Sequence, residues 1–297
     1  MTRVAVIASR KKVLGGGLPE LRRVLESRGL DMDKVFWREV GKSKYAPEQV
    51  EKALEHKAEL IFVWGGDGMV QRCVDVLAGT PARVAILPAG TANLLASNLG
   101  IPKDLEQAVD IGLSGNTRRI DVGRVNGERF AVMAGAGFDA RMIGDADGSL
   151  KDRFGRLAYI WTGAKNIREP PFRAKILVDG ARWYDGDASC ILLGNVGKLF
   201  GGVEAFEDAH PDDGVLELGV VSADGVREWA GTMVRAVVGT AAKSPHAFTT
   251  KGHSVRITLD RKVPYEIDGG DRKKVRKLRI DIEPNAVEIC VPAEEDA

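Results

Sequence analysis

The residues best suited to chemistry form a glycine-rich segment directly after an apolar run. Residues 61–64 predict a buried strand, and Gly65-Gly66-Asp67-Gly68 predicts a turn that opens a helix. Glycine lets a ligand approach the backbone closely, and a helix start offers N–H groups and its positive dipole end to an anion. We therefore predict that Gly65, Gly66, Asp67 and Gly68 bind phosphate. A strand-to-helix connection without a ligand is the alternative, but it explains three glycines in four residues poorly.

A second polar loop follows the next predicted strand. That strand covers residues 83–87, and Pro88-Ala89-Gly90-Thr91-Ala92-Asn93 comes directly after it. Because neighbouring strands of an open parallel sheet end at one crevice, both loops are expected to face the same ligand. Thr91 can bond a phosphate or cap the next helix, and the Asn93 amide offers a nucleotide both a donor and an acceptor. Gly90, Thr91 and Asn93 thus extend the predicted phosphate site.

Several other kinds of site are excluded because their patterns are missing. The chain has neither a GxxxxGK segment followed by Ser or Thr nor a GxGxxG, so the Walker A loop and the dinucleotide fingerprint are both absent. Cys73, Cys190 and Cys290 are odd in number and far apart, which predicts buried thiols rather than disulfides or a zinc site. The four histidines lack the spacing of a helical metal site.

The elements that must position these loops change in kind along the chain. Alternating strand and helix patterns before residue 117 predict βαβ units around a parallel sheet. The predicted strands are Val4–Ala8, Lys34–Val40, Glu59–Trp64 and Arg83–Leu87, and the predicted helices are Leu18–Ser27, Pro47–Lys57 and Met69–Ala78. Residues 1–117 are therefore expected to form a three-layer α/β nucleotide-binding domain.

Residues 118–297 are predicted to form a mainly antiparallel, β-sandwich-like domain. Turns are expected at Asn126-Gly127, Asp179-Gly180 and Asp213-Gly214. The predicted strands are Arg118–Val125, Arg129–Ala134, Phe172–Val178, Ala188–Leu193, Val215–Val221 and Val255–Leu259, and the predicted helices are Arg156–Ile167 and Val226–Ala241. The alternating tail from Lys273 to Val291 could close either sheet, which leaves open a return to the first domain.

Bulk properties describe an ordinary globular protein. The 297 residues carry a formal net charge of +1 and are 44% hydrophobic, with no apolar stretch near the ~20 residues of a membrane span. We expect a cytoplasmic protein without a transmembrane segment and without a nucleic-acid partner; homodimerisation stays open. The basic residues between Arg272 and Arg279 predict a solvated strand face, with contact to anionic lipid headgroups as the alternative.

Together these motifs carry a family resemblance. Gly65-Gly66-Asp67-Gly68 followed by Pro88-Ala89-Gly90-Thr91-Ala92-Asn93 resembles the paired signature of the diacylglycerol kinase catalytic domain family, which includes sphingosine and ceramide kinases. The second half agrees in the same order. Its matching segments are Ile120-Asp121-Val122-Gly123, Asn126-Gly127, the 135–139 turn, Gly194-Asn195, Phe200-Gly201-Gly202, Asp208-Ala209 and Asp212-Asp213-Gly214-Val215-Leu216.

The resemblance implies cofactors and site residues. ATP would bind in the cleft between the domains, against the two glycine loops and Lys11 of the first loop, and catalysis would need Mg²⁺. A structural Mg²⁺ would be held by Asp213 and the Val215 carbonyl, although a plain turn is a serious alternative there. Asp268, in Tyr265-Glu266-Ile267-Asp268-Gly269, would accept the proton of the alcohol; a turn-forming role is equally compatible with its residue type.

Three positions depart from the family pattern near the expected chemistry. The first loop has Ala8-Ser9-Arg10-Lys11-Lys12 in place of Asn-Pro-x-Ser-Gly, Met69 replaces a threonine, and Gly270 replaces a glutamate. Lys11 or Lys12 can still supply a point charge to phosphate, and a backbone N–H survives at Met69. The change at Gly270 removes a carboxylate unless Asp271 takes its role.

The sequence thus predicts an ATP-dependent lipid kinase that acts at the membrane surface as a peripheral protein. Its acceptor would be diacylglycerol, giving phosphatidic acid, or a sphingoid-type lipid. Two alternatives remain open: a nucleotide- or lipid-binding regulator without turnover, and a kinase of a soluble metabolite such as NAD.

Overall fold

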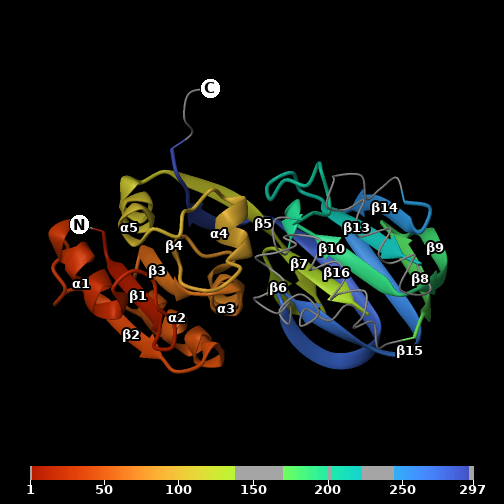
Figure 1. The fold of residues 1–297 in the computed structure, drawn as a ribbon, viewed down its shortest axis with the longest axis horizontal. Helices are drawn as coiled ribbons and strands as arrows, with labels where there is room; N and C mark the ends of the chain where they lie inside the picture. Colours follow the sequence, from red (N-terminus) through yellow and green to blue (C-terminus); the bar gives the residue numbers. More distant parts are fainter. Residues whose placement is uncertain (1, 138–169, 200–202, 223–243, 294–297) are drawn as a thin grey trace, which may run out of the picture. The chain divides into compact units, whose positions relative to one another are not determined.

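The computed structural model describes residues 2–137, 170–199, 203–222 and 244–293, which form two compact units (Figure 1). Unit 1 comprises Met1–Val122 and Pro284–Ala297, and unit 2 comprises Gly123–Glu283. The chain enters unit 2 within strand β5 (Thr117–Val125) and returns to unit 1 within strand β16 (Gly270–Cys290). The predicted helices Arg156–Ile167 and Val226–Ala241 lie outside the described residues.

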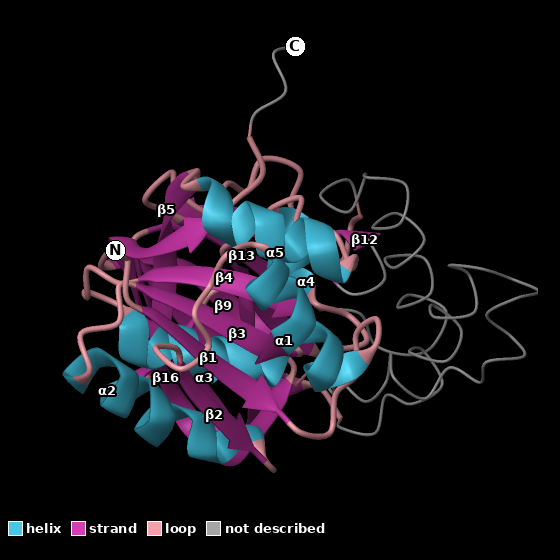
Figure 2. Ribbon diagram, turned by 90° about the vertical axis from the view of Figure 1, so that its left-hand side faces the viewer, coloured by secondary structure: helices cyan, strands magenta, loops and turns pink. Residues whose placement is uncertain are grey.

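Unit 1 is a parallel sheet flanked by helices (Figure 2). Its strands run in the order β16-β4-β3-β1-β2, with β1 at Val4–Ser9, β2 at Phe36–Val40, β3 at Leu60–Gly65 and β4 at Arg83–Pro88. Its helices are α1 (Gly17–Ser27), α2 (Ala46–Glu55), α3 (Asp67–Leu77), α4 (Leu94–Asn98) and α5 (Leu105–Ser114), with a 3₁₀ turn η1 at Ser43–Tyr45. All six residues of β3 are buried, as expected for a strand covered on both faces. The predicted α/β class is confirmed.

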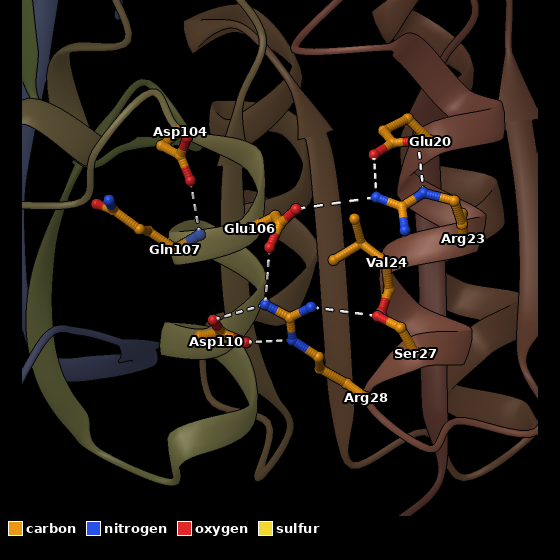
Figure 3. A network of polar contacts seen from close by, with 9 residues as sticks. All are labelled: Glu20, Arg23, Val24, Ser27, Arg28, Asp104, Glu106, Gln107 and Asp110. Carbon is orange, nitrogen blue, oxygen red and sulfur yellow. Dashed lines mark hydrogen bonds and ion pairs between the residues drawn. The ribbon is translucent and has the colours of Figure 1, made fainter.

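Helices α1 and α5 are joined by an ion-pair network (Figure 3). Arg28, the residue directly after α1, donates to Asp110 at 2.8 and 3.0 Å and to Glu106 at 3.2 Å, both on α5. Arg23 bonds Glu20 at 2.8 Å and lies 3.8 Å from Glu106. Exposed pairs contribute little one by one, but a bidentate network fixes geometry. The network therefore holds the C-terminal end of α1 against α5.

Unit 2 is built from antiparallel pairs around one apolar core. The strand order is β14-β13-β10-β7-β15-β16, with β9-β8 joined to β15 and β6 paired with β5. These strands are β6 (Glu128–Phe130), β7 (Met133–Ala136), β8 (Phe172–Val178), β9 (Ala181–Ala188), β10 (Cys190–Gly194), β13 (Leu216–Val221), β14 (Ala247–Gly252) and β15 (Ser254–Ile267), beside a short β11–β12 pair at Lys198–Leu199 and Val203–Glu204. The predicted antiparallel second half is confirmed.

Three hairpins of unit 2 turn on an Asx-Gly pair with positive φ at both residues. Asn126-Gly127 (φ 50° and 97°) joins β5 to β6, and Asp179-Gly180 (48° and 82°) joins β8 to β9. Asp268-Gly269 (44° and 75°) joins β15 to β16. Positive φ at both central residues is the turn geometry that matches strand twist, which explains the preference for these residue types.

The predicted single strand Arg129–Ala134 is wrong in one respect, because the structure divides it into β6 and β7. The backbone N–H groups of Ala131, Val132 and Met133 donate to the Asp268 carboxylate instead of to a neighbouring strand. A ladder cannot continue where its donors bind a side chain. The interruption therefore marks a local site rather than a weak strand.

Candidate functional site

The two glycine loops of unit 1 touch each other. Strands β3 and β4 are parallel neighbours, with Gly65 paired to Pro88 at their carboxyl ends. A Cβ on Gly90 would lie 2.5 Å from the Gly66 Cα, and one on Gly66 would lie 3.0 Å from the Gly90 Cα. Because these neighbours are backbone atoms, no side chain fits at either position without moving a loop. The glycines at 66 and 90 are thus required by the close approach of the loops.

Asp67 connects the two loops through hydrogen bonds. Its Oδ2 accepts the N–H of Asn93 at 2.9 Å, and its Oδ1 accepts the N–H of Leu94, the first residue of α4. Asp67 therefore caps a helix that belongs to the other loop. The alternative that Thr91 caps this helix is not what the structure shows, because Asn93 is the residue before α4 and its N–H donates to the Asp67 carboxylate.

Asn93 shapes its own loop. Its φ of 52° is left-handed, its Oδ1 accepts the Gly90 N–H at 2.8 Å, and its Nδ2 donates to the Gly90 carbonyl at 2.8 Å. The side chain is buried. Both amide groups are thus engaged with Gly90, and they fold the segment into a closed turn. Lys103 adds a 2.6 Å bond from its Nζ to the Thr91 carbonyl.

The start of α3 lies at this pair of loops. Gly66 precedes the helix in an extended conformation, and its carbonyl accepts the N–H groups of Met69 at 2.8 Å and Val70 at 3.1 Å. The Met69 N–H, which was expected to remain for phosphate, is thus engaged within the helix, and the N–H groups of Asp67 and Gly68 with the positive end of the helix dipole are left to form an anion-binding arrangement. Met69 is buried and packs beneath Gly65, where an added Cβ would lie 2.5 Å from the Met69 side chain. The methionine therefore fills apolar space at this helix start.

The first loop is tied to the same edge of the sheet. The Trp64 indole, buried at the end of β3, donates from Nε1 to the Lys12 carbonyl at 3.2 Å. Strands β1, β3 and β4 are adjacent and parallel, so the loops that follow them share one edge. Lys11 is exposed beside Lys12. Unit 1 thus places a lysine-bearing loop and two glycine loops at one end of its sheet.

Asp268 lies in unit 2, at the hairpin turn between β15 and β16. Its side chain is buried, with Oδ1 accepting the N–H groups of Val132 at 3.0 Å and Met133 at 2.8 Å, and Oδ2 accepting that of Ala131 at 3.0 Å. Hydrogen bonds to a carboxylate favour its ionised form. The residue is therefore more than a turn former, since it joins the hairpin to the β6–β7 link.

Arg272 lies beside Gly270, the position where the resemblance led us to expect a second carboxylate. Its Nη1 donates to the Gly270 carbonyl at 2.8 Å, and its Nε donates to Glu128 of β6 at 2.7 Å. The bond to Glu128 is the main cause of the raised pKa of Arg272. A Cβ on Gly270 would lie 2.8 Å from Arg272 Nη1, so the arginine occupies the space beside this glycine. Sequence analysis missed this pair, because 144 residues separate its partners.

Asp213 forms the turn that was the alternative to a metal site. Its Oδ1 accepts the Val215 N–H at 3.1 Å, and Gly214 has a φ of 78°. Burial raises the pKa of nearby Glu217, Lys251 opposes this, and the charges of Asp213 and Asp208 add to it. Within the described ranges no group of three or more His, Cys, Asp or Glu side chains is arranged to hold a metal ion. Mg²⁺ here would depend on one carboxylate, the Val215 carbonyl and water, which the ion's preference for retained water ligands allows.

The three cysteines are buried free thiols, as predicted. Burial raises the pKa of Cys73 and of Cys190 to about 12, with the charge of Glu266 adding to the effect at Cys190, and raises that of Cys290 to about 11. Thiols that hold their protons so strongly are poor nucleophiles and metal ligands.

Comparisons with known proteins match both halves of the chain. Residues 9–125 match the diacylglycerol kinase catalytic domain, and residues 132–291 match the YegS C-terminal NAD kinase beta sandwich-like domain. The chain is 30% identical to a diacylglycerol kinase of Bacillus subtilis (strain 168) over 232 residues, which are 75% of this chain and 75% of that protein.

Solved structures show the same fold. A diacylglycerol kinase from Bacillus anthracis str. Sterne superposes with a TM-score of 0.75 at 20% identity, covering 98% of this chain and 97% of that one. An NAD kinase from Archaeoglobus fulgidus in complex with ATP gives a TM-score of 0.56 at 10% identity, covering 98% and 94%. At these identities the likeness concerns the fold.

Proposed function

The chain belongs to the family that joins a diacylglycerol kinase catalytic domain to a YegS C-terminal domain, and from that premise we propose that it transfers the γ-phosphoryl group of ATP to a lipid hydroxyl. The observation that carries the proposal is the contact between the Gly66 and Gly90 loops, locked by the Asp67 carboxylate. Diacylglycerol is the proposed acceptor, followed by a sphingoid-type lipid.

Nucleotide binding is assigned to backbone groups of unit 1. The N–H groups at the start of α3 would hold phosphate oxygens, and the absence of side chains at Gly66 and Gly68 lets the phosphates approach. Lys11 supplies a positive charge from the exposed first loop. Asp67 and Asn93 act indirectly, because their polar atoms hold the second loop in place. Mg²⁺ bound with ATP would neutralise charge on the phosphates during transfer.

Asp268 is the proposed acceptor of the hydroxyl proton. Phosphoryl transfer requires positioning, charge neutralisation and a group that takes this proton. Asp268 is held rigidly by three backbone N–H groups, so its carboxylate has a defined orientation. Asp271 is exposed two residues after the turn and is the second candidate for this role.

A binding protein without turnover is the alternative function. It is favoured by Gly270, which leaves the turn without a second carboxylate, and by Arg272, which covers the vacated position. An arginine can contribute to phosphate binding but cannot accept a proton. A regulator would therefore bind nucleotide or lipid and release both unchanged.

The deciding experiment uses purified chain, γ-labelled ATP, Mg²⁺ and a total lipid extract, followed by identification of the labelled product. The expected product is a phosphorylated lipid whose formation stops when a chelator removes Mg²⁺. Parallel reactions contain NAD and no lipid, because a kinase of a soluble metabolite would label its acceptor without any membrane or detergent. ATP binding without any labelled product would instead support the regulator. Among the described residues no helix has the length and apolar character to cross a bilayer.

A further inference from the structure

Two arginines face each other across unit 2's long hairpin. Arg256 of β15 is paired directly with Arg279 of β16, and both side chains are exposed. Directly opposed residues of antiparallel strands lie on the same face with Cβ atoms about 4.5–5.5 Å apart, where like charges destabilise the sheet. Such a pair is unfavourable for the fold taken alone, which suggests that an anion outside the chain offsets its cost.

The neighbouring positions extend the same charge. Thr258 lies between Lys277 of β16 and Lys175 of β8, and all three are exposed on the face that carries the two arginines. We call Lys175, Arg256, Lys277 and Arg279 the basic face. Within the parts of the chain that the structure describes, none of these four side chains forms an ion pair. Asp185 of β9 is paired with Lys175 in the strand register, but its carboxylate bonds Arg173 at 2.9 Å and Arg182 instead.

The basic face also carries an apolar residue. Leu177 of β8 lies directly opposite Arg256 and is 37% exposed. Further along β16, Lys273 and Arg276 are also exposed, so positive charge continues toward the hairpin turn that holds Asp268. Lysine and arginine can lay their apolar stems on a surface while their charges reach phosphates, and a leucine among them suits an interface with an apolar layer beneath.

We propose that the basic face of β8, β15 and β16 is the surface by which this protein docks on a bilayer containing anionic phospholipid. The proposal rests on the proposed lipid kinase function, because a lipid acceptor must be reached at a membrane surface. The recognition is electrostatic, between four unpaired cations and lipid phosphates, with Leu177 entering the headgroup region. Nucleic acid is the other polyanion that a basic face could bind, and the test below distinguishes it from a membrane.

The test measures partition of the full-length protein into vesicles by co-sedimentation, without ATP. Vesicles of phosphatidylglycerol with phosphatidylcholine are compared with vesicles of phosphatidylcholine alone, at low and at physiological salt. We expect binding to the anionic vesicles only, weakened by salt. Each lysine or arginine near an anionic surface contributes roughly fivefold to partition, so the double variant Arg256→Gln/Arg279→Gln should bind roughly 25-fold more weakly.

The control variant removes two positive charges elsewhere. Lys42→Gln/Lys44→Gln changes exposed lysines of unit 1 and should alter partition less than about threefold. Neutralising Arg256 or Arg279 should leave the thermal midpoint unchanged or raised, since it removes a repulsion, so lost binding would not reflect unfolding.

Three results would overturn the proposal: equal binding to both vesicle types, equal loss in both double variants, or binding of a DNA duplex stronger than that of anionic vesicles. Because no catalysis is measured, these results are independent of the kinase assay. A labelled lipid together with no vesicle binding would keep the proposed function and reject the basic face.

Discussion

Asp67 in unit 1 and Asp268 in unit 2 both direct their carboxylates at backbone N–H groups, but the donors differ in kind. Asp67 accepts hydrogen bonds from the N–H groups of Asn93, which precedes α4, and Leu94, which begins it. Asp268 takes three consecutive N–H groups from the link between β6 and β7. The first carboxylate completes a helix start, whereas the second replaces part of a strand ladder.

This difference separates two ways in which a carboxylate can serve a site. By capping α4, Asp67 leaves the start of α3 to interact with an anion, so its effect on a ligand is indirect. Asp268 is itself the proposed proton acceptor, so the same bonds that hold the hairpin would also orient the reacting group. Substitutions near Asp67 should therefore act through loop geometry, and those at Asp268 should act on chemistry and on stability together.

The largest effect is expected for Asp268→Asn. Removing a general base typically lowers turnover about 10²–10⁴-fold. The asparagine can still accept N–H groups through its oxygen, but its NH₂ group would face a backbone donor, at a cost of about 1–3 kcal/mol in the free energy of unfolding. Turnover, ATP affinity and denaturant unfolding should be measured on the same preparation, and ATP affinity should stay nearly unchanged.

Asp271→Asn is the matched control, because it makes the same chemical change at an exposed carboxylate near the same turn. It should alter the free energy of unfolding by less than about 0.5 kcal/mol. Full turnover in a folded Asp268→Asn protein, with turnover lost in Asp271→Asn, would transfer the role of base to Asp271 and reduce Asp268 to a structural residue.

Gly90→Ala tests the contact that defines the unit 1 site. The new methyl group would lie 2.5 Å from the Gly66 Cα and 2.7 Å from Asn93 Oδ1, so the two loops must separate. Overpacking of this kind costs about 1–3 kcal/mol, and we expect at least roughly tenfold weaker ATP binding with it. Calorimetric titration with ATP and thermal unfolding measure the two effects.

Gly41→Ala provides the comparison, since an added Cβ there meets no atom within 4 Å. Its stability should change by less than about 1 kcal/mol and its ATP affinity should not change. If Gly90→Ala bound ATP as the wild type does, the paired loops would not be the nucleotide site.

Much of the fold could be predicted because its signals are local. The strands of unit 1 are apolar runs bounded by turn residues, and the structure places their ends within two residues of the predicted ones. Helix α5 was missed although Asp104 caps it at 2.9 Å and Gly115 ends it in a left-handed conformation, two signals that identify a helix. Strands β9 and β14 were missed because their side chains do not alternate between buried and exposed.

The positions of the site loops could be predicted from the sequence, but the hydrogen bonds made by their side chains could not. The sequence indicated two glycine loops at neighbouring strand ends, and strand pairing brings them together. It could not indicate that both amide groups of Asn93 bond Gly90, or that Arg272 reaches Glu128, because these contacts depend on how distant segments meet. Residue type fixed which bonds were possible, and tertiary structure selected among them.

Gly68→Ala separates ligand binding from folding within the same motif. Gly68 lies in the first turn of α3, its φ is not positive, and an added Cβ meets no protein atom within 4 Å. Alanine favours a helix over glycine by about 0.5–1 kcal/mol, so the thermal midpoint should rise. ATP affinity should nevertheless fall roughly tenfold, because the methyl group would stand where we place the phosphates. A more stable protein with unchanged affinity would locate the phosphates elsewhere.

The smallest effect on stability is expected for Glu217 of unit 2. Its carboxylate is held by fewer favourable contacts than that of Asp268. Its best cation, Lys251, is 4.0 Å away, and burial together with Asp213 and Asp208 raises its pKa. A carboxyl group with a raised pKa in the folded state contributes stability below its unfolded pKa and loses it as pH rises through the folded value. Glu217→Gln should therefore be slightly more stable than the wild type at neutral pH, by about 0.5 kcal/mol or less, and the advantage should vanish in acid below the ordinary glutamate pKa of 4.5. Denaturant unfolding of both proteins across this pH range measures the difference in their free energies of unfolding. An advantage that grew in acid would mean that the ionised Glu217 carboxylate stabilises the fold.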